Sequence, residues 1–411
     1  MRQDRVVVGL DVGTTKIVAL VGNVSDGAIE IIGMGRADSR GLEKGVVVDI
    51  GRTMASIRKA IEEAENMADV RIGSVYVGIT GKHISSINNS GTVSINRPDR
   101  IITADDVRRV VETAQAVQLP QESELIHIIP RQYIVDGQDG ITDPVGMTGT
   151  RLEVDVHIVT GSITAVHNLV RCVEALGIGI DQVVLEPLAS SMAVLSSAER
   201  ELGVILMDIG GGTTDISVFR GGDIWFSRVV PIAGEHITND ITVGLQTPIE
   251  AAEIIKKEVG TAVVDSVGED EKIEVATIGG DEKKSVSKKK LAKIIEPRVE
   301  EVLDLGIQEV EEAGYRDLVP VGMVLTGGTS LLHGITKFAS QRYDVPVRRG
   351  KIPPGIHGLR DIVESPIYAT AIGLLCYAVE TRDFQKGKYK RRRRASLIDK
   401  LLSWFNRFFR G

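Results

Sequence analysis

The sequence has few cysteines and lacks the histidine patterns of metal sites. Only two of its 411 residues are cysteine, Cys172 and Cys376, and they lie far apart with no CxxC pair. Such cysteines argue against a disulfide framework and against a zinc site, and they fit a reducing cytosol. The seven histidines form no HExxH motif, so catalysis by a histidine-bound metal is not expected.

Long apolar runs are also absent. No stretch reaches the roughly 18 uninterrupted apolar residues that a membrane-spanning helix needs. Charged residues flank an apolar run at 6–10 that is too short for a signal peptide. The GxxxxGK[ST] phosphate loop is missing as well, which excludes the nucleotide-binding proteins that depend on it.

What is present begins with an uneven charge. The net charge is −7, but residues 381–411 hold eleven Lys and Arg against two Asp, so this tail carries +9 and the rest −16. An acidic body with a basic tail predicts a tail that binds an anionic partner. The length corresponds to two to four domains of roughly 100–200 residues each.

One pattern of strand, glycine turn and strand occurs twice, at residues 5–24 and 203–232. The two copies can be aligned residue by residue. Asp11-Val12-Gly13 matches Asp208-Ile209-Gly210. Thr14-Thr15-Lys16-Ile17 then matches Thr213-Thr214-Asp215-Ile216, with Gly211-Gly212 as an insertion in the second copy. An internal repeat of this kind implies two similar lobes.

Each turn has the residues of a phosphate-binding site. The backbone N–H groups of a glycine turn point into one concavity and bind phosphate oxygens, and threonine hydroxyls add donors. The aspartate at each strand end is a candidate Mg²⁺ ligand, usually through water. A single turn is as readily an ordinary hairpin, but two such turns that face each other are expected to clamp one triphosphate.

Two weaker signals lie in the second half. Thr326-Gly327-Gly328-Thr329 follows a predicted strand at 321–326 and precedes a helix, so the backbone can approach a flat ligand closely. Glu253 and Lys256, spaced i and i+3, share one helix face. The alternatives are a plain strand-end turn and a solvated ion pair.

The remaining pattern predicts a mixed α/β chain. Residues 84–160 read as a small α+β unit inserted in a larger domain, with a helix that begins at Thr103 and a capping box completed by Asp106. We expect strands near 29–36 and 74–80 and helices at 52–68, 162–197 and 365–380. Residues 236–313 should be mostly helical, with a polar segment at 268–290 that interrupts the helices. Residues 381–395 should form a charged linker.

In this order the motifs resemble the ATPase superfamily of actin, Hsp70 and the sugar kinases. The resemblance implies a two-lobed fold that binds ATP and Mg²⁺ between the lobes, with Thr326-Gly327-Gly328 as the adenosine motif. It implies catalytic roles for Glu186, which would orient the attacking water, and for Asp208; Asp11 and Asp208 would serve Mg²⁺, through water. The implied nucleotide-binding residues are Asp11, Gly13, Thr14, Thr15, Lys16, Gly210, Gly211, Gly212, Thr213, Gly234, Glu253, Lys256, Gly327, Gly328 and Thr329.

The basic tail has the pattern of an amphipathic helix. At about 100° per residue, its apolar residues fall within an arc of roughly 160°, and polar residues fill the other side. A basic run at 390–394 stands just before them, and large aromatics beside clustered cations suit an anionic lipid surface. The alternatives are docking on the protein's own body, which needs no such run of cations, and nucleic-acid binding, which needs no complete apolar face. The predicted membrane-binding residues are Leu397, Ile398, Leu401, Leu402, Trp404, Phe405, Phe408 and Phe409.

An actin-like ATPase with such a tail resembles the FtsA family of bacterial cell-division proteins. Residues 41–50, 230–234 and 295–298 are family-like, and the insertion at 84–160 resembles the distinctive subdomain of that family. The resemblance implies a peripheral protein on the cytoplasmic face of the cell membrane at the division site. It would tether FtsZ filaments, polymerise, and recruit later division proteins, without nucleic acid as a partner.

The resemblance also implies that the C-terminal peptide of FtsZ binds the subdomain at 229–305, with Arg298 and Glu301 as contacts. The alternative for Arg298 is a structural ion pair beside a helix break at Pro297. ATP turnover is left open, with at most a weak ATPase activity expected. A small-molecule kinase and a pilus-type ATPase remain competing functions. A kinase would gain nothing from the tail. The tail and residues 41–50 favour a role in cell division over a role in pilus assembly.

These expectations divide the chain into six parts. Lobe 1 comprises 1–83 and 161–200, interrupted by the insertion at 84–160. Lobe 2 comprises 201–228 and 306–380, interrupted by a small subdomain at 229–305. A basic linker at 381–395 and the membrane-targeting helix at 396–411 complete the chain.

Overall fold

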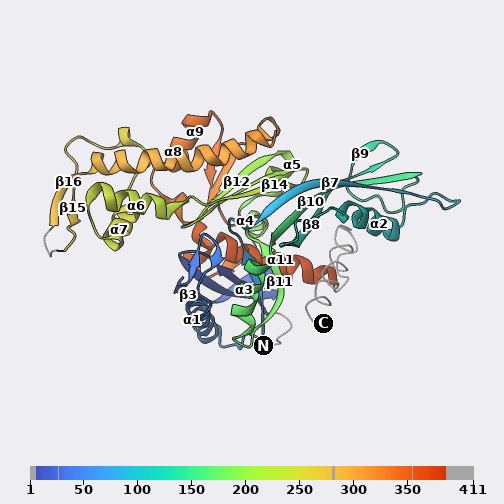
Figure 1. Cartoon of the computed structure of the whole chain (residues 1–411), viewed down its shortest axis with the longest axis horizontal. Coiled ribbons are helices and arrows are strands. Elements are labelled where there is room, and N and C mark those ends of the chain that lie inside the picture. Colours follow the sequence, from blue (N-terminus) through green and yellow to red (C-terminus); the bar gives the residue numbers. More distant parts are fainter. Residues whose placement is uncertain (1–5, 26, 280–282, 354, 386–411) are drawn as a thin grey trace.

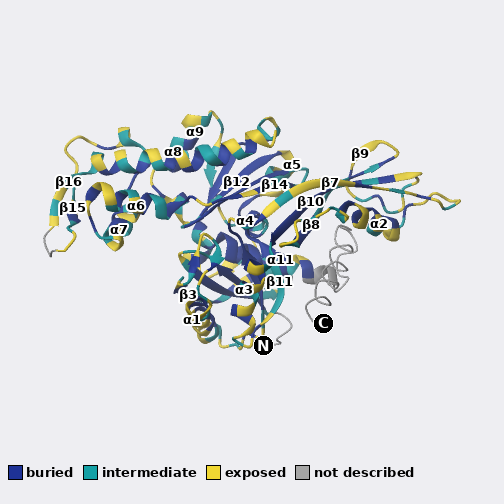
Figure 2. Ribbon diagram, in the orientation of Figure 1, coloured by how far each residue is buried: buried dark blue, intermediate teal, exposed yellow. Residues whose placement is uncertain are grey.

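Two lobes of mixed α/β structure lie one above the other, and a smaller subdomain projects from each side of the upper one (Figure 1). The computed structural model describes residues 6–385 except 26, 280–282 and 354. The predicted tail helix at 396–411 and most of the predicted linker lie outside the described residues. Each lobe is organised around one sheet whose central strands are buried (Figure 2).

Lobe 1 contains a six-stranded sheet in the order β11-β6-β1-β2-β3-β19. β1 and β2 form an antiparallel hairpin, and β6 and β11 add parallel strands beside β1. Helix α1 packs so closely on β3 that a Cβ on Gly33 would lie 2.8 Å from the carbonyl oxygen of Ala64, which explains the glycine. The elements are β1 Val6–Val12, β2 Lys16–Ser25, β3 Ala28–Asp38, β4 Leu42–Glu43, β5 Val46–Val47, α1 Ile50–Ala68, β6 Ser74–Ile79, α3 Ile163–Glu174, β11 Gly179–Leu185, α4 Glu186–Val194, α5 Ser197–Leu202 and β19 Ile356–Gly358.

Lobe 2 repeats this arrangement, which confirms the two similar lobes. Its five-stranded sheet runs β14-β13-β12-β17-β18. Each lobe therefore has a central hairpin, a third antiparallel strand on one side and two parallel strands on the other. The elements are β12 Val204–Ile209, β13 Thr214–Arg220, β14 Asp223–Val230, η3 Arg316–Leu318, β17 Met323–Thr326, η4 Gly328–Leu331, α9 Ile335–Tyr343, β18 Val347–Arg349, α10 Arg360–Val363 and η5 Pro366–Tyr368.

The two central hairpins have turns of equal length. Val12 pairs with Ile17, and Ile209 pairs with Thr214, so four residues separate the closing pair in both lobes. In each turn the N–H of the first residue donates to the carbonyl of the fourth at 3.0 Å.

The predicted insertion of Gly211-Gly212 is therefore wrong. Gly211 and Gly212 stand where lobe 1 has Thr14 and Thr15. Matching the repeated Thr-Thr letters misaligned the turns, because backbone pairing and not residue identity fixes the register of a hairpin.

The insertion is a four-stranded antiparallel sheet in the order β7-β10-β8-β9, with α2 packed on β7 and β10. The predicted capping box of α2 is confirmed: the Asp106 N–H donates to Thr103 Oγ1, and the Asp106 carboxylate accepts from the Thr103 N–H at 2.9 Å. The elements are β7 Ser85–Ser94, α2 Ala104–Gln115, β8 Ser123–Val135, β9 Gln138–Ile141 and β10 Arg151–Ser162.

Between β14 and β17, lobe 2 carries a smaller, mostly helical subdomain. The predicted polar segment at 268–290 contains a β-hairpin that its sequence does not predict, because the two strands bury only one residue fully and are rich in Lys, Glu and Ser. The predicted break at Pro297 is also wrong, since α8 continues through it. Buried Ile295 and Val299 fix the helix on both sides of the proline, and this burial offsets its cost of roughly 3 kcal/mol. The elements are α6 Gly234–Leu245, α7 Ile249–Val259, η2 Val264–Ser266, β15 Lys272–Ala276, β16 Lys283–Ser287 and α8 Lys288–Glu312.

Two helices cross between the lobes. α4 follows β11 of lobe 1 and packs on β12 and β13, while α11 (Ala369–Gln385) follows lobe 2 and packs on β1 and β2. They meet at Gly373, where a Cβ would overlap the backbone of Ala189.

The same region corrects two further expectations. Residues 162–197 are not helical throughout, because β11 lies between α3 and α4. This seven-residue strand was missed because it is short and has no clear alternation. α11 also extends to Gln385, five residues beyond the predicted end at 380.

Candidate functional site between the lobes

The two glycine turns meet face to face. A Cβ on Gly212 would lie 2.7 Å from Cγ2 of Thr14, and a Cβ on Gly211 would overlap the side chain of Thr15. Because Gly211 and Gly212 are the turn counterparts of Thr14 and Thr15, this contact is nearly two-fold symmetric. The threonines of one turn fill the space that the missing side chains leave in the other. The structure thus brings both predicted phosphate motifs to one place.

Four carboxylates gather around these turns: Asp11, Asp208, Asp215 and Glu186. Buried Asp11 pairs with Lys16 at 3.1 Å, whereas the other three form no ion pair within the described part of the chain. Burial and the neighbouring carboxylates raise the pKa of Asp208 to about 6 and that of Asp215 to about 8, and they hold the pKa of Glu186 well above its usual range. Buried carboxylates crowded in this way favour the arrival of a positive charge.

Glu186 is placed at the cleft by the step from strand to helix. It is the first residue of α4 and directly follows β11, with Pro187 in the first turn. Gly78 on the neighbouring strand β6 leaves room for it, since a Cβ there would lie 3.1 Å from Cγ of Glu186. Glu186 is buried, yet its Oε1 has no hydrogen-bond partner among the residues that the structure describes. A buried acceptor without a donor is costly, so this oxygen fits a ligand or its water.

Several residues of the site were missed from the sequence. Thr80 donates to Asp215, Thr370 donates to Asp208 at 3.2 Å, and Ser190 also bonds Asp208. Thr80 had a signal, because it follows β6, the parallel neighbour of β1, and such strands end at the same sheet edge. Thr370 and Ser190 lie on the crossing helices, where no sequence signal pointed to them. Asp215 was overlooked because the wrong register hid its pairing with Asp208.

On the lobe 2 side, the predicted nucleoside residues surround Gly210. Its carbonyl accepts from Thr329 Oγ1 at 2.8 Å and from the Gly234 N–H at 3.2 Å. Lys256 Nζ donates to the Gly234 carbonyl at 3.0 Å and pairs with Glu253 at 2.6 Å. These five residues, from four segments of the chain, form one continuous group.

The two glycines of the predicted adenosine motif differ. Gly327 has φ +81°, and a Cβ on it would lie 2.5 Å from the carbonyl oxygen of Ile209, so the backbone requires glycine there. A Cβ on Gly328 would face open space. The protein's own packing therefore explains Gly327 but not Gly328.

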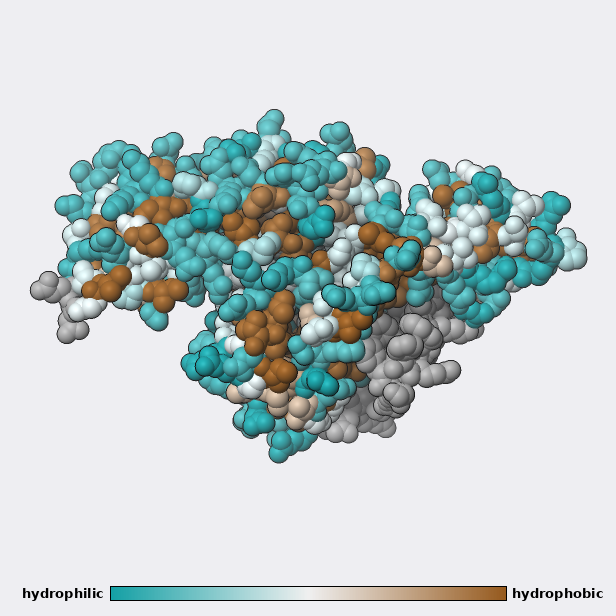
Figure 3. Space-filling model, in the orientation of Figure 1, coloured by the Kyte–Doolittle hydropathy of each residue, from teal (hydrophilic) through white to brown (hydrophobic). Residues whose placement is uncertain are grey.

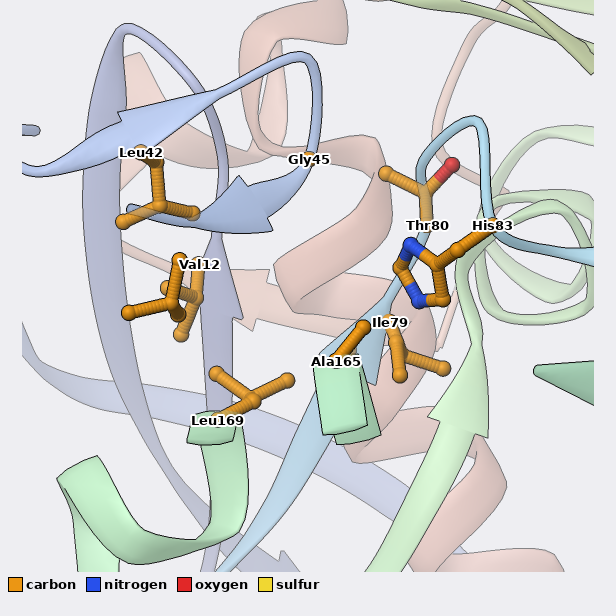
Figure 4. Close-up of a pocket in the computed structure, with 10 residues that line it drawn as sticks. Val12, Leu42, Gly45, Ile79, Thr80, His83, Ala165 and Leu169 are labelled. Carbon is orange, nitrogen blue, oxygen red and sulfur yellow. The ribbon is translucent and has the colours of Figure 1, made fainter. Parts of the chain in front are cut away.

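Residues 41–47 form a strap over the first turn. The Gly45 N–H donates to Thr14 Oγ1 at 3.2 Å, and a Cβ on Gly45 would lie 2.6 Å from Cα of Gly81. A small pocket between the strap and the end of β6 is lined by apolar side chains together with Thr80 and His83 (Figure 4). Neither ring nitrogen of His83 has a hydrogen-bond partner in the described part of the chain, and burial lowers its pKa to about 4. The imidazole is therefore neutral at pH 7.

The predicted FtsZ contacts lie on α8 of the small subdomain. Arg298 donates to both carboxylate oxygens of Asp240, at 2.6 and 3.1 Å, and also pairs with Glu301. This is the structural ion pair that the sequence left open as the alternative. Nearby, α6 and α7 expose Val243, Ile249 and Ile254, and Figure 3 shows separate apolar patches in this part of the surface. Peptide binding here stays a prediction.

The predicted membrane-binding residues at 397–409 lie outside the described residues, and their role stays a prediction. In the described part of the chain, no helix has the length and apolar character needed to cross a bilayer.

Comparisons with known proteins place the chain in a family. A family model described as "Cell division protein FtsA" matches residues 205–373, and one described as "SHS2 domain inserted in FTSA" matches residues 81–160. The Cell division protein FtsA of Pseudomonas aeruginosa is 45% identical over 92% of this chain and 91% of its own length. The Escherichia coli protein of the same name is 40% identical over 98% of both chains.

Solved structures with low identity share the fold. A chain of the PilM–PilN type IV pilus biogenesis complex has a TM-score of 0.66 at 16% identity and covers 91% of this chain and 98% of its own. MreB5 of Spiroplasma citri bound to ADP has a TM-score of 0.57 at 15% identity and covers 93% of this chain and 98% of its own. These likenesses show a two-lobed, actin-like ATPase fold, here with an inserted α+β subdomain. With 40–45% identity to such relatives over nearly its whole length, the chain belongs to the FtsA family of cell-division proteins.

Proposed function

We propose that the chain is an ATP-binding division protein that tethers FtsZ filaments to the inner face of the cytoplasmic membrane, polymerises and helps assemble the division septum. The observation that carries the proposal is the pair of glycine turns that meet between the lobes beside buried carboxylates. The turns offer N–H donors to phosphate oxygens, and the carboxylates offer negative charge to a cation. Two structures of the similar MreB5 are described as bound to ADP and to AMPPNP, which supports nucleotide binding by this fold.

ATP with Mg²⁺ fits these residues. Residues 13–15 and 210–213 would hold the phosphates, Asp11 and Asp208 would face Mg²⁺, and Gly234, Glu253, Lys256 and 327–329 would flank the nucleoside. Mg²⁺ usually keeps several waters and is bound by one or two carboxylates together with substrate phosphates, so these aspartates would serve it mainly through water. Bound Mg²⁺ would supply charge neutralisation at the phosphates. The unpartnered Oε1 of Glu186 is suited to orient a water.

Calorimetric titration of the full chain with AMPPNP and Mg²⁺ tests this site. Wild type should bind, and Gly212→Ala should bind at least about tenfold more weakly, because the new Cβ presses on Thr14. Gly73→Ala is the matched control, since a Cβ at Gly73 meets nothing within 4 Å. Equal affinities for all three proteins would contradict the proposed nucleotide site.

The tail would provide membrane attachment. Burying one large apolar side chain is worth about 1.5–3 kcal/mol, and each cation near an anionic surface about 1 kcal/mol. Trp404→Glu should therefore release the chain from anionic vesicles more completely than Arg393→Ala in co-sedimentation. High salt should weaken binding without abolishing it. A Trp404→Glu protein that still pellets with vesicles would show that the tail docks elsewhere.

The proposed FtsZ contact can be separated from the ion pair of Arg298. Arg298→Glu should reduce co-pelleting with FtsZ filaments, but it also places two acids together at Asp240. The double variant Arg298→Glu, Asp240→Arg restores the pair while it changes the exposed charge. Co-pelleting that stays low in the double variant supports a direct contact with FtsZ. Full recovery would assign Arg298 to structure alone.

A further inference from the structure

The inserted subdomain contacts both lobes. On lobe 1, to which the chain links it, β8 packs on β11 and His127 Nε2 accepts from the Leu185 N–H at 3.0 Å; the subdomain's other contact is with lobe 2. It follows β6 directly through residues 80–84 and returns through β10 into α3, both parts of lobe 1. Its strands β7, β8 and β10 contact β14 of lobe 2, and Figure 1 shows it beside that strand. The subdomain therefore bridges the two lobes.

The polar part of this docking junction centres on His157. Asn88 Nδ2 donates to the Trp225 carbonyl at 3.1 Å and to the Tyr315 hydroxyl at 2.8 Å, so Asn88 Oδ1 is left as an acceptor. His157 Nδ1 lies 2.8 Å from that oxygen, and its Nε2 lies 2.9 Å from Ser227 Oγ. The network thus assigns the proton to Nδ1, and Nε2 accepts from the serine. Burial, and then the charges of Arg131 and His127, lower the pKa of His157 to about 3, so the ring is neutral.

The aromatic part of the junction surrounds Trp225 of β14. The Arg131 guanidinium of β8 lies 4.0 Å from the centre of the Trp225 ring, a cation–π contact across the two bodies. Tyr315 meets the same ring edge to face, with centroids 6.3 Å apart. The docking junction therefore comprises Asn88, Arg131, His157, Trp225, Ser227 and Tyr315.

The junction is connected to the candidate nucleotide site at both ends. Thr80, the residue after β6, donates to Asp215 of lobe 2, and the chain runs from there into the insertion. On the other side, Ser227 pairs in register with Ser217, two residues after Asp215 on β13. Closed turns and a docked junction occur together in this structure, and parting the lobes would draw β14 away from β7.

We propose that closure of the cleft and docking of the inserted subdomain stabilise each other, so that nucleotide binding sets the orientation of this subdomain. The inference rests on the proposed binding of nucleotide between the lobes. Coupling of this kind is reciprocal: if nucleotide tightens docking, loosening the junction weakens nucleotide binding by the same factor.

Two neighbouring asparagines on β7 provide a matched pair of variants. Asn88 reaches lobe 2, whereas Asn89 Nδ2 donates to the Ala114 carbonyl within the inserted subdomain, at 2.7 Å. Asn88→Ala should raise the Kd of AMPPNP with Mg²⁺ about fivefold or more. Asn89→Ala should leave it within about twofold, since it breaks no contact with lobe 2.

A second readout follows the junction directly. The chain has two tryptophans, so Trp404→Phe leaves Trp225 as the only one. AMPPNP with Mg²⁺ should reduce acrylamide quenching of Trp225, and Asn88→Ala should increase quenching in the absence of nucleotide. If Asn88→Ala fails to fold, Ser227→Ala removes only the hydroxyl that bonds His157.

The outcomes separate the two proposals. A wild type that does not bind AMPPNP rejects the nucleotide site and the coupling with it. A wild type that binds, with an unchanged Kd in Asn88→Ala or unchanged quenching of Trp225 on binding, rejects the coupling alone. The coupling is supported if Asn88→Ala raises the Kd for AMPPNP, Asn89→Ala does not, and nucleotide reduces the quenching of Trp225.

Discussion

The two central hairpins share one backbone conformation, but the residues at the tips of their turns differ in size: threonines in the first and glycines in the second. Both begin with an aspartate at the strand end and close a four-residue turn with the same hydrogen bond. Where the first turn has Thr14 and Thr15, the second has Gly211 and Gly212, and these positions face each other. The two copies of the hairpin are therefore complementary. The threonine side chains of the first turn, with their hydroxyl groups, pack into the space left by the glycines of the second.

The hairpins also differ in how they balance charge. Asp11 of the first has Lys16 as an ionic partner at 3.1 Å. Asp208 of the second instead faces another carboxylate, Asp215, where the first hairpin has Val18. Hydroxyl groups bond both acids of the second hairpin. The second hairpin thus depends more on a positive charge from outside the protein.

The largest expected effect comes from filling the space in the second turn. Gly211→Ala should weaken AMPPNP binding about 10–100-fold, because overpacking against Thr15 costs about 1–3 kcal/mol. Adding Thr15→Ser removes Cγ2, the atom nearest to the new Cβ, and keeps the hydroxyl. The double variant should regain most of the affinity in calorimetry, with Thr15→Ser alone as the control.

Failure of this rescue would break the comparison. It would mean that Gly211 leaves space for a ligand and that the facing threonine does not matter.

The sequence was sufficient for what depends on local pattern. Two lobes, both glycine turns and the capping box of α2 follow from residue types at short spacing. The register of the second turn did not follow, because it depends on backbone pairing. The strand β11, the hairpin at 272–287 and the continuous α8 were missed because tertiary packing decides them. Ser190 and Thr370 reach the site only through the crossing of α4 and α11, which no local pattern encodes.

An intermediate effect is expected from neutralising one aspartate in each hairpin. Asp11→Asn leaves Lys16 largely buried without its partner, at a cost of about 2–4 kcal/mol, and should lower the melting temperature by roughly 2–5 °C. Asp215→Asn relieves repulsion with Asp208 and keeps an acceptor for Thr80, so the melting temperature should stay the same or rise. Circular dichroism melts without nucleotide measure both. Equal losses in the two variants would show that the hairpins balance charge in the same way.

The smallest effect on the protein itself should come from Gly328→Ala. This variant tests whether every glycine at the site is explained by the protein group that its Cβ would meet. Gly211 and Gly212 face threonines, but a Cβ on Gly328 would meet no atom of the described residues within 4 Å, and its φ is not positive. The melting temperature of Gly328→Ala should therefore match that of wild type, with a change in stability within about 0.5 kcal/mol. Gly327→Ala is the control that should destabilise, because φ is +81° and its Cβ would meet Ile209. If a nucleoside approaches Gly328 as proposed, AMPPNP affinity should still fall severalfold in calorimetry. An unchanged affinity would show that no ligand requires this glycine and would remove it from the proposed site.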